Sequence, residues 1–76
     1  MEKWKENYLE VLRLAPNHTL LGIYVEDQIP DDYDGGFTSR GEWRREASAK
    51  AFYARLVSTG WITAEQLKES GAEDWF

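Results

Sequence analysis

The stretch from Thr19 to Glu26 reads Thr-Leu-Leu-Gly-Ile-Tyr-Val-Glu, and the fold predicted from this sequence depends on it. It is short and rich in β-branched and aromatic residues, a composition that favours an extended strand over a helix. A strand would distribute its apolar side chains over two faces: Leu21, Ile23 and Val25 on one, Leu20 and Tyr24 on the other. Because both faces are apolar, the pattern predicts a strand that is covered on both sides.

Helices are predicted on either side of this stretch. Residues 2 to 14 carry apolar side chains at helical spacing, and Pro16 ends this helix. Residues 42 to 58 show a broad apolar arc, followed by Gly60 as a helix-ending residue. The breadth of that arc predicts that the second helix lies across the centre of the fold.

A third, shorter helix is predicted over residues 64 to 70. Thr63 fits the N-cap position, and Gln66 follows three residues later, which completes a capping box. Gly71 fits the position just after the helix. These signals are local, so they predict the helix independently of how it packs.

The segment from Asp27 to Gly41 is rich in Gly, Pro and Asp, which is typical of turns. Within it, residues 36 to 39 fit a short second strand, with Asp34 and Gly35 as the hairpin turn. The predicted fold is therefore α+β, in the order helix, strand, short strand, long helix and short helix. A minimal antiparallel sheet would pack against the helices in a single domain over residues 1–76.

The composition limits how so short a chain can be stabilised. A core in a chain of 76 residues rarely supplies more than about 3–5 kcal/mol. The sequence has no cysteine and one histidine, His18, so it offers no disulfide framework and too few ligands for a structural zinc site. We therefore expect no cofactor or metal, and stability from its aromatic residues or from oligomerisation.

The chain is acidic, with 14 Asp and Glu against 9 Lys and Arg and a net charge of −5. This balance argues against general binding to nucleic-acid phosphates. The charged residues at the N-terminus do not resemble a signal sequence, and the apolar stretch from Leu20 to Val25 is too short to cross a bilayer. We therefore expect a cytoplasmic protein without a membrane segment.

The first candidate site is a cluster of acidic residues around the predicted loop. It is a poor calcium loop, because Pro30 would stand at the first ligand position and Glu42 comes one residue too late. Two interpretations remain open: a solvated turn that pairs with the basic helix, or a patch that binds Lys and Arg of a partner protein. The predicted contact residues are Glu26, Asp27, Asp31, Asp32, Tyr33 and Asp34.

The long predicted helix carries a basic stripe, which consists of Arg40, Arg44, Arg45 and Arg55. Arginine is the side chain that most often recognises guanine, so the stripe also fits a nucleic-acid interface. Acidic residues intersperse the stripe, and the broad apolar arc requires this helix inside the fold. Pairing between the stripe and the acidic loop is therefore the favoured interpretation.

The C-terminal residues Trp75 and Phe76 are the second candidate site. Burying two aromatic side chains would contribute several kcal/mol to a small fold, so folding back onto the core is the favoured interpretation. The alternative is a docking segment in which the two rings anchor a partner.

Nothing in the sequence indicates catalysis. His18 has no cysteine to activate, and no glycine-rich phosphate loop is present. We therefore expect a small acidic protein–protein binding module, an inhibitor or adaptor that occludes a partner with a basic surface. Small inhibitors of restriction or CRISPR effectors, encoded by phages and mobile elements, share this size and charge, an analogy without a motif behind it.

The predicted strand gives a further reason to expect association. A single strand leaves its backbone groups unpaired unless another strand adds to its edge. That strand would come from a second copy, giving a homodimer, or from a target protein. If residues 19 to 26 are helical, this reason disappears. A homodimeric structural protein and an acidic nucleic-acid mimic remain the alternative functions.

Overall fold

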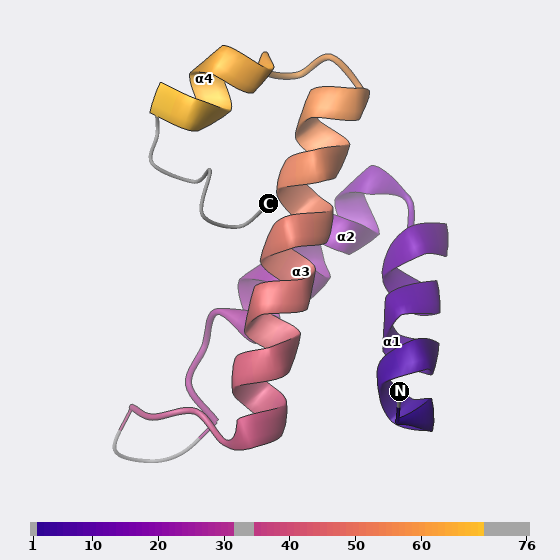
Figure 1. The fold of residues 1–76 in the computed structure, drawn as a ribbon, viewed down its shortest axis with the longest axis vertical. Helices are drawn as coiled ribbons and strands as arrows, with labels where there is room; N and C mark the ends of the chain where they lie inside the picture. Colours follow the sequence, from indigo (N-terminus) through magenta and orange to yellow (C-terminus); the bar gives the residue numbers. More distant parts are fainter. Residues whose placement is uncertain (1, 32–34, 70–76) are drawn as a thin grey trace.

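The computed structural model describes residues 2–31 and 35–69, and all regular structure within these ranges is α-helical. The helices are α1 (Lys3–Leu14), α2 (Asn17–Asp27), α3 (Ser39–Ser58) and α4 (Ala64–Glu69). The long helix α3 stands at the centre, with α2 behind it, α1 to one side and α4 near its C-terminal end (Figure 1). None of the described helices is both long and apolar enough to cross a membrane.

The predicted α+β fold is wrong, because the described ranges contain no strand at residues 19–26, at residues 36–39 or elsewhere. The first of these segments lies in α2, where Leu20, Tyr24 and Asp27 recur at helical spacing and share one face. Leu20 is fully buried, and the ring of Tyr24 stacks on Phe52 of α3 with 4.6 Å between centroids. A helix pairs its own backbone groups, so no partner strand is needed.

The three predicted helices are confirmed. Residues 2 to 14 correspond to α1, and residues 64 to 70 correspond to α4, whose capping box is present. The amide of Gln66 donates to Oγ1 of Thr63 at 3.1 Å, and the amide of Thr63 donates to Oε1 of Gln66 at 2.8 Å. The prediction of residues 42 to 58 corresponds to α3, which begins earlier than expected. Gly71 lies outside the described residues.

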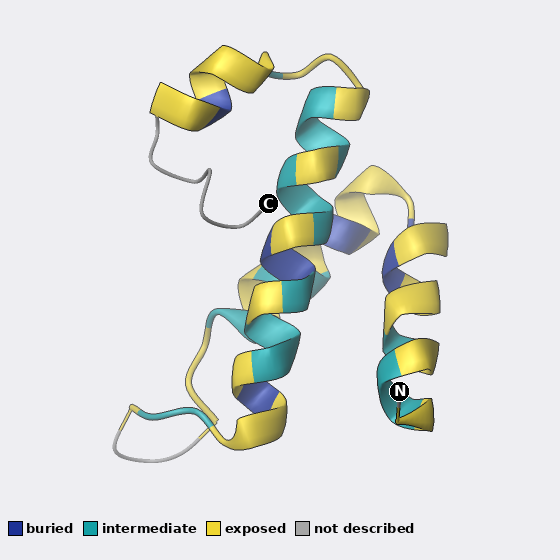
Figure 2. Ribbon diagram, viewed as in Figure 1, coloured by how far each residue is buried: buried dark blue, intermediate teal, exposed yellow. Residues whose placement is uncertain are grey.

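The core lies where α1, α2 and α3 meet. Leu12, Ala15 and Leu20 form its buried cluster, and half-buried side chains surround them: Tyr8, Ile23, Ala47, Ala51 and Phe52. Figure 2 shows that most of the remaining surface of α1 and α2 is exposed. Because so few side chains are buried, contacts at the helix ends are important for stability.

Aromatic rings join the first half of α1 to the start of α3. Trp4 and Tyr8 approach Trp43 edge-on, with ring centroids 5.2 Å and 5.9 Å away. This geometry suits the opposite charges on the face and edge of aromatic rings, and each such pair adds about 0.5–1.5 kcal/mol beyond burial. It fixes the N-terminal half of α1 against α3.

The guanidinium of Arg55, on α3, binds the end of α1 and the start of α2. Its Nη1 donates to the carbonyl of Ala15 at 2.7 Å and to Oδ1 of Asn17 at 3.1 Å. Its Nη2 donates to the carbonyls of Leu12 at 3.2 Å and Arg13 at 3.3 Å. The last carbonyls of a helix lack intrahelical partners and carry partial negative charge, so a cation at this end is stabilising.

Replacing Arg55 with Met should lower the free energy of unfolding by about 2–3 kcal/mol, because several charge-assisted hydrogen bonds to the part-buried end of α1 are lost together. Urea unfolding followed by circular dichroism measures this change. The matched control is Arg13→Met, since Arg13 is exposed and, among the described residues, its guanidinium pairs only with Glu10 at the surface. Equal effects of the two substitutions would show that the Arg55 contacts contribute no more than a surface pair.

Candidate functional site

The acidic residues predicted to contact a partner have different surroundings. Glu26 is exposed near the end of α2, and its carboxylate has no partner within the described part of the chain. Asp27 and Asp31 both face Arg44 of α3: Nε of Arg44 lies 3.8 Å from Oδ1 of Asp27, and its Nη2 lies 3.2 Å from Oδ1 of Asp31. The other predicted contact residues lie outside the described ranges: Asp32, Tyr33, Asp34, Trp75 and Phe76.

Asp31 fixes the start of α3. Its Oδ2 accepts a hydrogen bond of 2.9 Å from Oγ1 of Thr38, and the same hydroxyl accepts from the amide of Gly41 at 3.0 Å. A carboxylate at a helix N-terminus is also favoured by the helix dipole. Gly41 allows this approach, because a Cβ there would collide with the carboxylate of Asp31. The role of Asp31 in this structure is therefore to position α3.

Asp27 is half-buried between α1, α2 and α3. The hydroxyl of Tyr8 donates to its carboxylate. Burial raises the pKa of Asp27 above its ordinary value, and the negative charge of Asp31 acts in the same direction. The hydrogen bond from Ser48 and the charge of Arg44 lower the pKa but do not cancel the effect of burial.

The Asp27→Asn variant should gain stability relative to the wild type as the pH rises. The folded wild type holds the Asp27 proton more tightly than the unfolded chain, so it loses stability as pH rises from the unfolded pKa through the folded pKa. The side chain of asparagine does not titrate, so the variant lacks this loss of stability. Urea unfolding across this range should therefore give a variant-minus-wild-type difference that increases with pH and then levels off. A difference that decreases would contradict the assigned direction of the pKa shift.

Each arginine of the predicted basic stripe contacts another part of the chain. The prediction that the stripe pairs with the acidic loop is confirmed for Arg44. The guanidinium of Arg40 lies 4.6 Å from the ring centre of Trp4, and that of Arg45 lies 5.3 Å from the ring centre of Phe37. Arg55 binds the end of α1 instead of an acidic residue. The stripe thus serves the packing of α3.

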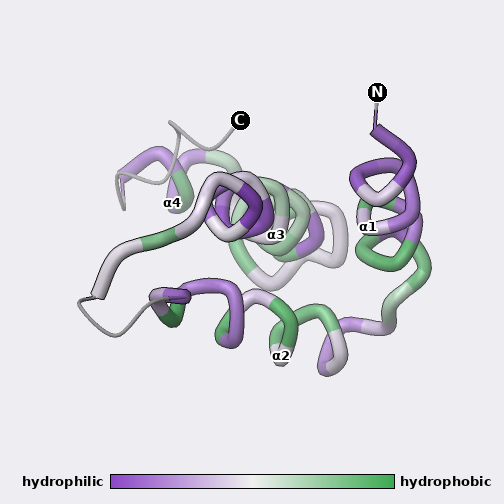
Figure 3. Tube along the Cα trace, turned by 90° about the horizontal axis from the view of Figure 1, so that it is seen from below, coloured by the Kyte–Doolittle hydropathy of each residue, from purple (hydrophilic) through white to green (hydrophobic). Residues whose placement is uncertain are grey.

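The side of α2 that faces away from α3 is apolar and exposed. Leu21 and Val25, one turn apart, are 46% and 52% exposed, and Ile29 just beyond the helix is 62% exposed. With His18 and Gly22, these residues form what we call the outer stripe. In Figure 3, α2 lies along one edge of the molecule with no other helix beyond it. Adjoining uncovered apolar side chains mark interaction surfaces on small proteins.

A groove of about 280 Å³ borders the outer stripe between α2 and the C-terminal half of α3. Leu20, Phe52 and Leu56 line it, and Trp61, which is 71% exposed, lies at its edge. Polar side chains also line the groove: Asn17, His18, Arg55 and Thr59. An exposed tryptophan beside an apolar groove with a polar rim has the composition of an interface hot spot.

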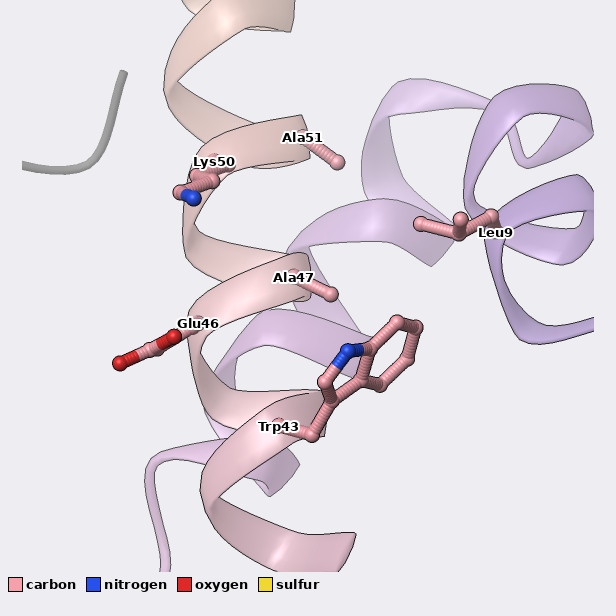
Figure 4. A pocket seen from close by; sticks show the side chains of 6 residues that line it. All are labelled: Leu9, Trp43, Glu46, Ala47, Lys50 and Ala51. Carbon is pink, nitrogen blue, oxygen red and sulfur yellow. The ribbon is translucent and has the colours of Figure 1, made fainter. Parts of the chain in front are cut away.

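A second hollow, of about 420 Å³, lies between α1 and α3. In Figure 4, Leu9 extends from α1 toward α3, and Trp43, Ala47 and Ala51 lie on the side of α3 that faces it. The side chains of Glu46 and Lys50 lie away from α1. The two alanines leave space between the helices but offer no protruding anchor. The stronger interface features therefore lie on the α2 side.

The sequence prediction missed the outer stripe and Trp61. It assigned the two apolar faces of residues 19–26 to a sheet, although Leu21 and Val25 also recur at helical spacing. A tryptophan in the short connection between Gly60 and the capping residue Thr63 was a further signal. Comparisons with protein-family models, with curated proteins and with solved structures give no match for this chain.

Proposed function

We propose that this chain is a protein–protein binding module that binds through the outer stripe and the adjoining groove. The observation that carries this proposal is the exposure of Leu21, Val25 and Trp61 on one side of the molecule, next to an apolar groove. Full burial of such a side chain contributes about 1.5–3 kcal/mol, so a few anchors supply most of the energy of binding.

An exposed negative charge beside this surface favours a partner with a basic group. Glu26 follows Val25 directly, is exposed, and has no partner within the described residues, so it would meet a basic group of the bound protein. Asp27 and Asp31 are already paired with Arg44. Those two acids hold the fold, which disfavours the alternative of a nucleic-acid mimic, since a mimic needs an array of unpaired acids.

Binding rather than catalysis is the activity that we propose. The half-buried ionisable groups of α2 and α3 are used in packing, because Asp27 pairs with Arg44 and Tyr53 shares a hydrogen bond of 2.9 Å with Tyr24. Burial and this hydrogen bond raise the pKa of Tyr53 to about 12. Such a phenol stays protonated at neutral pH and is a poor general base.

Site-directed photo-crosslinking in the source cell tests this proposal. A photoreactive benzoylphenylalanine at Val25 or Trp61 should give discrete crosslinked species, because the proposed partner covers both positions. The same residue at Val11 should not, although Val11 is also 52% exposed, since it lies on α1. Crosslinking of equal yield from Val11 and Val25, or none from either α2-side position, would contradict the proposal.

A competition experiment sharpens the test. An excess of unlabelled wild-type protein should suppress the crosslink at Trp61, whereas an excess of Leu21→Asp protein should not, because a charge on the stripe must be desolvated on binding. Circular dichroism of the Leu21→Asp variant verifies its helical content. Equal suppression by both proteins would remove Leu21 from the binding surface.

A further inference from the structure

We infer that the outer stripe of α2 pairs antiparallel with the same stripe of a second copy of this chain. The inference rests on the proposed function, because it assigns a particular occupant to the same binding surface. Its basis is the spacing of the stripe, the open space at Gly22 and the charges at the two ends of α2.

The outer stripe has the spacing of a helix–helix seam. His18, Gly22, Val25 and Ile29 follow one another at intervals of four, three and four residues. This is the repeat at which successive side chains keep facing one partner helix. Leu20 and Tyr24 occupy the opposite face of α2 and pack on α3. α2 is therefore apolar on two sides, and the described residues cover only one of them. A helix that is apolar all round is normally buried between two neighbours.

Antiparallel pairing makes this seam complementary to itself. Consider a two-fold axis that crosses both copies of α2 midway between positions 23 and 24. Val25 of each copy then lies opposite Gly22 of the other. A Cβ at Gly22 would meet no described atom within 4 Å beyond its own stretch of helix, so the backbone there is open to a neighbour. Each valine therefore meets a position without a side chain, as a knob meets a hole.

The charges on α2 also match those of a second copy. The same register places Glu26 about one helical turn from the second copy's His18, beside the positive N-terminal end of that helix. α2 carries no lysine or arginine, and both His18 and Glu26 are exposed. A second copy thus offers Glu26 a positive helix end and an imidazole that can donate a hydrogen bond.

The size of the core gives an independent reason for self-association. The largest fully buried side chains among the described residues are Leu12, Leu20 and Ser48. Folds of this size commonly need oligomerisation or another reinforcement, because a single small core supplies little stability. Covering Leu21, Val25 and Ile29 would add a second apolar layer on the other side of α2.

Sedimentation equilibrium of the purified full chain is the test. The wild type should sediment as a concentration-dependent dimer. The Val25→Asp variant should raise the dissociation constant at least about tenfold, because an unpaired carboxylate would be buried at the seam. The Val11→Asp variant is the matched control, with the same substitution at the same exposure on α1, and should leave the constant unchanged.

The Gly22→Gln variant separates dimerisation from folding. Glutamine is a better helix former than glycine, and the single chain has room for its side chain, so the monomer should be no less stable than the wild type. In the dimer the same side chain fills the hole for Val25, so association should weaken. Glu26→Lys should weaken association about two- to fivefold, because it places an ammonium beside that positive helix end. Adding His18→Glu should restore association, because a carboxylate at position 18 would then pair with the ammonium at position 26.

The outcomes separate this inference from the proposed function. A monomeric wild type at all soluble concentrations, or a dimer that Val25→Asp and Gly22→Gln leave intact, overturns the inference. If the wild type is monomeric and the Val25 crosslinker captures a different protein, the proposed function stands and only the second copy is wrong. A dimer that is weakened by both stripe variants and not by Val11→Asp supports the inference.

Discussion

The hydrogen bonds of Arg55 connect three parts of the chain that are far apart in sequence. One guanidinium binds the terminal carbonyls of α1 and the side chain of Asn17 at the start of α2. At the other end of α2, Arg44 approaches Asp27 and Asp31. The two arginines are eleven residues apart, about three turns of α3, so they lie on nearly the same side of that helix. They hold the two ends of α2 against α3.

This arrangement determines which side chains of α2 are exposed. Because both ends are held, Leu20 and Tyr24 pack on α3, while Leu21 at the groove and Val25 stay about half exposed. Asp27 and Asp31 are then needed for the fold, since both face Arg44 and Asp31 also anchors the start of α3. These polar contacts thus serve the fold, while the apolar outer stripe stays exposed.

The sequence was sufficient to predict the helices whose signals are local. The capping box of α4 and the apolar spacing of α1 and α3 agree with the structure. α2 was mispredicted because its apolar residues fit both the helical and the strand period, and tertiary contacts with α3 decide between them. The acidic residues were identified, but the structural roles of Asp27 and Asp31 depend on where Arg44 lies. The exposure of Trp61 depends on how the helices cover one another, which local patterns do not encode.

The central claim is that residues 17–27 form a helix with one face on α3 and the other left uncovered by the described residues. Backbone carbon chemical shifts and side-chain nuclear Overhauser effects of a dilute sample test it most directly. The account predicts helical shifts from Asn17 to Asp27, contacts between Leu20 and Phe52, and no intramolecular contact from Val25 to α3. Extended shifts over residues 19–26, or contacts from Val25 to the core, would contradict it.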